Sequence, residues 1–365
     1  MLRSSFYQKY LLPGFVFQSI IIGGGYGTGR ELIEWFMSEG PVGGLIGMLV
    51  SATIMSVVLG LTFELCRRFK TYDYRTFMQR ILGKGWFAFE VIYLAMLVLI
   101  VSVMGSAAGE LLERMLGWPE IAGIIVLILA VGFMAFFGND MIEKIFSIWS
   151  FALYGTFFLV IVTSIVTFGS EIGGLIGDFD PDSAWFMSGV KYAGYNIGLA
   201  PAGFFALRHL QTRKEALSSG VIAGALGMVP AMLAFVGMLA VYPGVLSESI
   251  PIDHLLVAIG WPWLRILFQI VLFGTLIETG VGVIHGFNER IAGVYHEQGR
   301  EMPSGLRIGI AAVLLLIAIF LADAVGIVDL IAKGYGTLTW AYWAVFLIPV
   351  LIFGTWTIWF KKDRS

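Results

Sequence analysis

Long apolar stretches follow one another along almost the whole chain and are separated by short polar connections. Many of them reach the about 20 residues that a helix needs to cross a bilayer. The pattern predicts an all-α polytopic membrane protein of about ten transmembrane helices with no soluble domain. The expected segments are residues 8–38, 42–66, 86–112, 119–138, 142–168, 184–208, 216–242, 262–290, 306–324 and 326–359.

Charged residues are distributed unevenly between the two sides of this layout. Most of the 23 Lys and Arg residues lie at the termini and after even-numbered segments, whereas the opposite connections carry mainly Asp and Glu. The positive-inside rule therefore predicts cytoplasmic termini in a bacterial cytoplasmic (inner) membrane. Two short amphipathic helices are expected outside the bilayer, at 72–82 on the inner face and at 246–258 on the outer face. No signal-peptide pattern is recognisable, so the first segment is expected to be retained.

Composition supports the membrane interpretation and excludes several other classes. The chain has 58% hydrophobic and 13% charged residues with a mean hydropathy of +0.86, far more apolar than a soluble domain. A net charge of -2 and the lack of a basic domain argue against nucleic-acid binding, and a single cysteine permits no internal disulfide. The partners expected are the lipid bilayer and a small solute.

The first predicted helix contains an unusual glycine cluster. Residues 22–30 read Ile-Gly-Gly-Gly-Tyr-Gly-Thr-Gly-Arg. Glycine in a helix interior costs about 1 kcal/mol relative to alanine, so the cluster favours local unwinding. Unpaired backbone groups at membrane depth are tolerated only where they line a cavity or meet a ligand. The cluster therefore indicates solute binding inside the membrane.

A second predicted break lies in the sixth segment, at residues 192–201, where Pro201 and two glycines weaken the helix. Both breaks contain the pattern Gly-Tyr-x-x-Gly. Each opens a group of five segments, and an odd number of crossings gives the two groups opposite orientations. We therefore expect inverted repeats at 1–168 and 184–359, with discontinuous first and sixth helices that mark a transporter's binding site.

This arrangement resembles the amino acid, polyamine and organocation transporter superfamily, which has the five-plus-five inverted repeat called the LeuT fold. The stretch 23–31 and the chain length are similar to the YkvI-like bacterial membrane proteins. In the superfamily's sodium symporters the first helix unwinds at glycines and an arginine follows; Gly24 and Arg30 occupy similar places here. The dense glycines remove side chains that would define a pocket, so the resemblance does not imply a particular substrate.

Helix ends at the two breaks offer free amides and a positive dipole end, which suit an anionic group. The candidate cradles are residues 26–29 and 199–203. Close helix packing is the alternative explanation for the glycines, and interfacial or capping roles are the alternatives for the polar residues of the sixth segment. The candidate substrate-binding residues are Gly23, Gly24, Gly25, Tyr26, Gly27, Thr28, Gly29, Tyr192, Tyr195, Asn196 and Gly198.

Arg30 is costly in a membrane helix and should face a partner or a water-filled vestibule. Glu34, one turn along the same helix, can form an intrahelical ion pair with it. Alternatively, Arg30 and an acid at the start of the tenth segment form an outer gate, for which Asp329 is the better candidate and Asp323 the weaker.

The eighth segment offers a candidate site for the coupling ion. Helical spacing places Thr275, Glu278 and Thr279 on one oxygen-rich face. The resemblance implies a sodium ion between hydroxyls here and backbone carbonyls of the first segment, near Ile20 and Gly23. Glu278 can ligate sodium or carry a proton, so both ions stay open; a structural glutamate is the alternative.

The leading hypothesis is a secondary active transporter that works by alternating access. Sodium or protons would drive uptake of a small zwitterionic or anionic solute such as an amino acid, with no other cofactor. The alternative is a membrane receptor that binds a solute without carrying it. An enzyme is not expected, because the four histidines lack ligand spacing and no nucleophile motif is recognisable.

Overall fold

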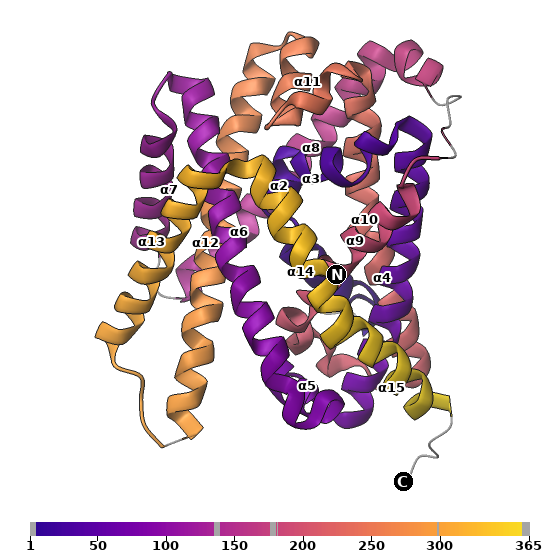
Figure 1. Cartoon of the computed structure of the whole chain (residues 1–365), viewed down its shortest axis with the longest axis vertical. Helices are drawn as coiled ribbons and strands as arrows, with labels where there is room; N and C mark the ends of the chain where they lie inside the picture. The colour runs from indigo at the N-terminus through magenta and orange to yellow at the C-terminus, as the bar shows by residue number, and fades with distance from the viewer. Residues whose placement is uncertain (1–4, 135–138, 176–179, 181, 298, 360–365) are drawn as a thin grey trace.

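The computed structural model describes residues 5–134, 139–175, 180, 182–297 and 299–359, and all regular structure in these ranges is helical. The helices form an elongated bundle, with α5 at one end and α11 at the other (Figure 1). The α-helices are α1 (Leu12–Ile21), α2 (Gly24–Thr28), α3 (Arg30–Trp35), α4 (Pro41–Phe69), α5 (Tyr74–Leu82), α6 (Trp86–Leu116), α7 (Glu120–Met134), α8 (Asn139–Leu175), α9 (Trp185–Gly198), α10 (Arg213–Met238), α11 (Pro251–Ile259), α12 (Pro262–Glu297), α13 (Ser304–Asp329), α14 (Gly336–Tyr342) and α15 (Ile348–Trp359). Tighter or wider helical turns form η1 (Tyr7–Leu11), η2 (Met37–Glu39), η3 (Gly83–Gly85), η4 (Ala200–His209), η5 (Leu239–Val241), η6 (Gly244–Ser247), η7 (Leu330–Tyr335) and η8 (Trp343–Leu347).

Among the described residues, 6 helical stretches are long and apolar enough to cross a membrane, and α7 is a shorter apolar helix. The class predicted from the sequence, an all-helical membrane protein, is thus confirmed. The expected first and sixth segments are divided into shorter helices, and the last two expected segments fall within one stretch, so the count of ten stays a prediction. The six stretches are Pro41–Phe69, Tyr74–Leu116, Phe151–Leu175, Arg213–Val241, Pro262–Ile284 and Gly309–Ile358.

The glycine cluster interrupts the first expected helix in two places. α1 ends at Ile21, Ile22 has ψ 89° and Gly23 is extended, and α2 then begins at Gly24. α2 ends at Thr28 and is followed by Gly29, whose φ of +86° lies in the left-handed region that glycine adopts without steric cost. The chain from Leu12 to Trp35 is therefore three short helices rather than one.

The sixth expected segment changes its helical type instead of unwinding. α9 ends at Gly198, and the narrower 3-10 segment η4 continues to His209. The amide of Leu199 donates to the Asn196 carbonyl and that of Ala202 donates to Leu199, each at 3.1 Å. Pro201 has no amide to lose, and its fixed φ suits the first turn of a helix. The backbone at this point is consequently more regular than the sequence predicted.

Both short helices expected outside the bilayer are present as α5 and α11. Asp73 begins α5, because its carboxylate accepts a hydrogen bond from the Thr76 amide at 2.8 Å, and Phe77 is buried beneath it. Pro251 opens α11 in the first turn, where a missing amide costs nothing, and Gly260 ends it in the left-handed conformation. These local interactions define where the two helices begin and where α11 ends.

The broken first helix lies between two groups of packed helices. α4 packs against α10 and α9, whereas α6 packs against α13 and α7. α1 contacts α10 and η4, α2 contacts α6 and α12, and α3 contacts α9 and η7. The helices on either side of the break at Ile22 and Gly23 thus contact helices of both groups.

Glycines allow α4 and α10 to approach to backbone contact. A Cβ atom at Gly220 would lie 2.3 Å from the Cα atom of Gly60, which is closer than two carbon atoms that are not bonded to each other can approach. We expect Gly220→Ala to force α4 and α10 apart and to cost about 1–3 kcal/mol, the usual range for overpacking. Thermal unfolding of the detergent-purified protein measures this as a lower melting temperature.

Gly237→Ala in the same helix is the matched control, since its Cβ would meet Ser164 at an ordinary 3.7 Å. Equal melting temperatures for the two variants would show that backbone contact at Gly220 does not limit the packing of α4 and α10.

Candidate functional site

A cavity of about 450 Å³ lies beside the break in the first helix. It is enclosed by α1, α3, α6, α8, α9, η4, α12 and η7. Ile22 and Gly23 form part of its wall, so the extended backbone borders the space directly. The polar side chains that line it include Glu31, Tyr195, Asn196, Thr275, Glu278 and Thr279.

Glu31 on α3 is the most deeply placed acid of this cavity. Its side chain is 3% exposed, and its Oε2 accepts a hydrogen bond from the Tyr195 hydroxyl at 2.7 Å. Gly25 leaves room for this carboxylate, because a Cβ there would lie 2.3 Å from Oε1 of Glu31. The glycine cluster therefore makes space for a side chain.

Sequence reasoning missed Glu31, although a signal was present. An acid inside a membrane segment is a functional candidate by default. Arg30 drew attention to its helical neighbour Glu34, and the acid directly after it was not weighed. The left-handed turn at Gly29 sets the orientation of α3 and so directs Glu31 to the cavity, which helical periodicity alone does not predict.

Aromatic rings surround the Glu31 carboxylate. The ring of Tyr195 lies 5.0 Å from that of Tyr335 and 5.5 Å from that of Tyr192, measured between centroids. Trp35 lies 6.2 Å from Tyr195 on the other side. Tyr195 and Tyr335 both line the cavity, as does Asn196, whose amide donates to the Tyr192 carbonyl at 2.9 Å. The cavity wall here therefore combines tyrosine rings with a carboxyl group.

The predicted face of α12 also lines the cavity, opposite the break. The Thr275 hydroxyl donates to the Val271 carbonyl at 2.9 Å, and the Thr279 hydroxyl donates to Thr275 at 3.0 Å. Because both protons are used within the helix, the hydroxyl oxygens keep lone pairs that can accept or coordinate. A Cβ at Gly23 would lie 4.0 Å from Cγ2 of Thr279, so the structure brings this face to the break.

Other predicted glycines lie in helix contacts instead of the cavity wall. Cβ atoms at Gly24 and Gly27 would meet Met104 at 3.2 Å and Leu272 at 3.0 Å, and one at Gly198 would meet Tyr342 at 2.3 Å. For these positions the packing alternative describes the observed surroundings. Gly29 supplies the left-handed turn.

Three further predicted residues also have places outside this cavity. Thr28 is buried and its hydroxyl donates to the Gly25 carbonyl at 3.1 Å. Tyr192 packs on Phe36, with ring centroids 4.8 Å apart. Tyr26 lines a second, apolar cavity of about 260 Å³ between α8 and α10. Binding roles for these residues stay predictions.

Arg30 points toward the connection before α11 and is not among the residues that line the cavity. Its guanidinium donates to Glu34 at 3.1 Å and to the backbone carbonyls of Leu246 and Glu248, each at 3.1 Å. Asp329 instead pairs with Lys333 at 2.7 Å. In the structure Arg30 therefore forms the ion pair with Glu34 of the same helix. A gate between Arg30 and Asp329 remains a prediction for another conformation.

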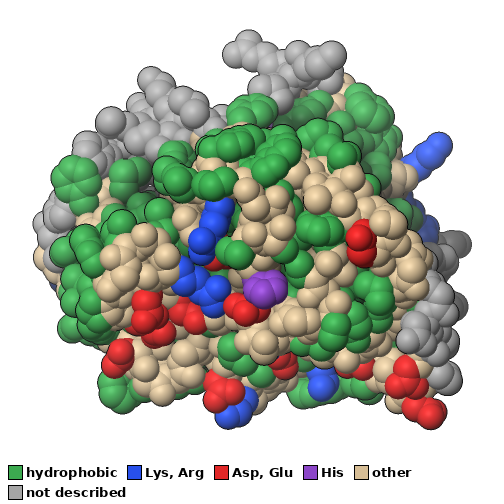
Figure 2. Space-filling view, turned by 90° about the horizontal axis from the view of Figure 1, so that it is seen from above, with side chains coloured by type: hydrophobic (Ala, Val, Ile, Leu, Met, Phe, Trp, Pro, Cys, Tyr) green, Lys and Arg blue, Asp and Glu red, His purple; other side chains and the backbone are tan. Residues whose placement is uncertain are grey.

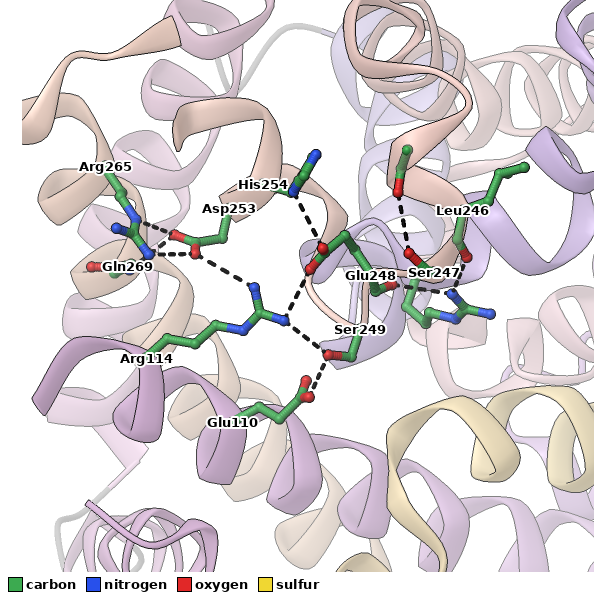
Figure 3. A network of polar contacts seen from close by, with 12 residues as sticks. Glu110, Arg114, Leu246, Ser247, Glu248, Ser249, Asp253, His254, Arg265 and Gln269 are labelled. Atoms are coloured by element: carbon green, nitrogen blue, oxygen red, sulfur yellow. Dashed lines mark hydrogen bonds and ion pairs between the residues drawn. The ribbon is translucent and has the colours of Figure 1, made fainter. Parts of the chain in front are cut away.

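A charged network holds the segment from Leu246 to Asp253 over this end of the bundle (Figure 3). Arg114 of α6 pairs with Glu248 at 3.1 Å, and Arg265 of α12 makes two 2.8 Å hydrogen bonds to Asp253. Viewed from this side, charged groups of both signs gather near the centre of the surface (Figure 2). The network links three helices through one connection.

Further contacts complete the same network. Glu110 of α6 accepts a hydrogen bond from Ser249, and Gln269 of α12 donates to Asp253 at 2.9 Å. Among the described residues, no group of three or more His, Cys, Asp or Glu side chains is placed to hold a metal ion.

Comparison with known proteins agrees with the membrane architecture. The chain is 22% identical to the uncharacterized membrane protein YkvI of Bacillus subtilis (strain 168) over 280 residues. This match covers 76% of this chain and 79% of YkvI. The chain is a homologue of YkvI. No protein-family model matches it.

Solved structures identify the fold. MhsT in complex with L-phenylalanine matches with a TM-score of 0.62 and 16% identity over 96% of this chain and 89% of that chain. The chain has the LeuT fold. A mutant of the Eremococcus coleocola manganese transporter matches with a TM-score of 0.58 and 13% identity, over 98% of this chain and 89% of that chain. A Na+-coupled sialic acid symporter matches with a TM-score of 0.54 and 12% identity, over 96% of this chain and 85% of that chain.

The charged network around Asp253 leads to a testable prediction about stability. Asp253 has a fully buried side chain that satisfies Arg265 and Gln269. We expect Asp253→Asn to cost about 2 kcal/mol, because hydrogen bonds to charged groups contribute more than neutral ones, and thermal unfolding measures the loss.

Asp329→Asn is the matched control, since that carboxylate is 46% exposed and pairs with an exposed lysine. Exposed pairs contribute little. An Asp253→Asn protein that melts with the control would contradict a stabilising role for the network.

Proposed function

We propose that the protein is a secondary active transporter that moves a small organic solute, an amino acid or a related compound, by alternating access. The observation that carries this proposal is the cavity bordered at once by the break at Ile22 and Gly23, by Glu31 and by the Thr275–Thr279 face. A solute in this cavity would touch extended backbone, acids and aromatic rings together. The fold shared with solved transporters supports the same conclusion.

Transport in this fold would involve two inverted repeats, which we place at residues 1–168 and 184–359. Helices at equivalent positions of these repeats pack on each other: α4 on α10, and α1 on η4. The first and sixth transmembrane helices would then be the interrupted pair at the centre. Ten crossings with cytoplasmic termini, in a bacterial inner membrane, complete this proposed layout.

A sodium ion or a proton would couple at the α12 face. Glu278 lines the cavity beside Thr279, and the hydroxyl oxygens of this face are available to a cation. Backbone carbonyls of Ile20 and Gly23 would supply further oxygens across the gap. An ion here would stabilise the same backbone that borders the solute, which is how its binding would favour solute binding.

Flux into proteoliposomes tests this function directly. Purified protein is reconstituted and assayed with a panel of amino acids and amines under an inward sodium gradient, an inward proton gradient, an outward proton gradient or none. We expect accumulation with one of these three gradients. A solute that binds without any flux would favour a receptor instead.

Glu278→Gln tests the coupling site. Removing the carboxylate should abolish gradient-driven accumulation, a loss of at least about tenfold, which corresponds to about 1.4 kcal/mol. Glu171→Gln is the matched control, because Glu171 is exposed and hydrogen-bonds to its neighbour Ser170. Unchanged accumulation in the Glu278→Gln protein would refute this coupling role.

A further inference from the structure

The charge balance of the cavity points to the kind of solute. Its described lining contains two acids, Glu31 and Glu278, and no lysine, arginine or histidine. An anionic or carboxylate group placed beside Glu31 would meet like charge. A positively charged group would instead meet carboxylates and tyrosine rings.

Glu31 lacks a counter-charge in the described structure. Its side-chain partner is the neutral Tyr195 hydroxyl, and no described basic side chain forms an ion pair with it. Taking an ionised carboxylate out of water costs several kcal/mol unless a cation compensates it. The Glu31 carboxyl must therefore carry a proton or hold a cation at every stage at which it is buried.

Basic side chains on α3 and on two elements packed against it interact with groups other than Glu31. Arg30, on the same helix, bonds to Glu34 and to the Leu246 carbonyl. Lys191 of α9 lies over the Trp35 ring at 5.9 Å from its centroid, and Lys333 of η7 pairs with Asp329.

The titratable groups that face Glu31 from the neighbouring elements are tyrosines. They are Tyr26 on α2, Tyr192 and Tyr195 on α9, and Tyr335 on η7, all neutral near pH 7. Glu278, on α12, lines the same cavity. None of these groups supplies positive charge.

The rings beside the carboxylate complete a cation-binding surface. Tyr195 and Tyr335 lie 5.0 Å apart between centroids, and both line the cavity. Aromatic faces attract ammonium groups. The combination of one carboxylate and adjacent tyrosines suits the positive charge of an organic ammonium group.

We propose that the Glu31 carboxylate binds either a proton or the ammonium group of an organic amine, so that the protein exchanges a cationic amine for a proton. This inference rests on the proposed transport function. As the amine enters, the Glu31 carboxyl releases its proton to water on the same side and forms an ion pair with the ammonium. After the amine leaves on the other side, a proton from that side neutralises the carboxylate for the return. One positive charge crosses in each direction.

Competition for one carboxylate fixes the sign of the pH dependence. Lowering the pH fills the site with protons, so the apparent affinity for the amine should fall, by up to about tenfold per pH unit once the protonated form dominates. Each amine bound should release a proton into solution in that range.

Detergent-purified full-length protein with three probes of one carbon skeleton tests this proposal. Phenethylamine is a cation, phenylalanine is a zwitterion and 3-phenylpropionate is an anion. We expect phenethylamine to raise the melting temperature more than the other two and to release protons in weakly buffered solution. Putrescine and tetramethylammonium extend the cation set.

Variants of Glu31 separate binding from folding. Glu31→Gln should remove both the thermal shift and the proton release, whereas Glu31→Asp keeps the charge and should bind at least about tenfold more weakly. Gly25→Ala should also weaken binding, because its Cβ would displace the Glu31 carboxylate. Glu171→Gln should behave as the wild type. Should Glu31→Gln fail to fold, the aspartate and Gly25 variants still decide the matter.

Melting temperatures, binding and flux each have an outcome that would contradict amine and proton exchange at Glu31. The proposal is wrong if none of the three cations shifts the melting temperature, or if phenylalanine or 3-phenylpropionate binds equally to the wild type and Glu31→Gln. Gradient-driven uptake of a solute that is unchanged in Glu31→Gln leaves the transport function standing and removes this inference. Amine binding with proton release but without flux would support competition at Glu31 and would refute both the transport function and the exchange.

Discussion

The cost of unpaired polar groups in a membrane is the constraint on which this structure depends. The chain interrupts its first helix at Ile22 and Gly23, where the regular hydrogen-bond pattern fails. Such a break is tolerated only where protein or a bound solute satisfies the backbone. Helices from both packed groups surround it, and the cavity opens at the same point. The interruption and the cavity are therefore two aspects of one arrangement.

The cost of placing polar groups inside a membrane applies to carboxyl side chains as well as to the backbone. Glu31 and Glu278 come from different helices, and each is placed where a desolvated charge is expensive. A soluble protein could relieve that cost with water, but a membrane interior offers only protons, cations or neutral donors. The tyrosine hydroxyl at 2.7 Å from Glu31 is a neutral donor that leaves room for a cationic partner. The cationic amine proposed above follows from this arrangement, whereas the free amides at the helix ends led to the expectation of an anionic or zwitterionic solute.

Sequence reasoning reached the features that depend on local pattern. Hydropathy predicted the all-helical membrane class, glycine density predicted the break, and helical spacing placed Thr275 and Thr279 on the face that meets Gly23. It missed what long-range geometry decides. The acceptors of Arg30 include carbonyls of Leu246 and Glu248, which are backbone atoms more than two hundred residues away and carry no side-chain signature. The direction of Glu31 likewise depends on the turn at Gly29 and on the packing of α3 against α9.

The contact of Gly220 with Gly60 bears on how such a molecule can change shape. Where two backbones touch, no side chain stands between them that could adopt another rotamer and let one helix slide past its neighbour. Movement between α4 and α10 is thereby restricted to small rotations about the glycine contact, and larger displacements must occur where the chain is already interrupted. The contact between Gly220 and Gly60 would then act as the pivot, and the broken first helix as the part that swings.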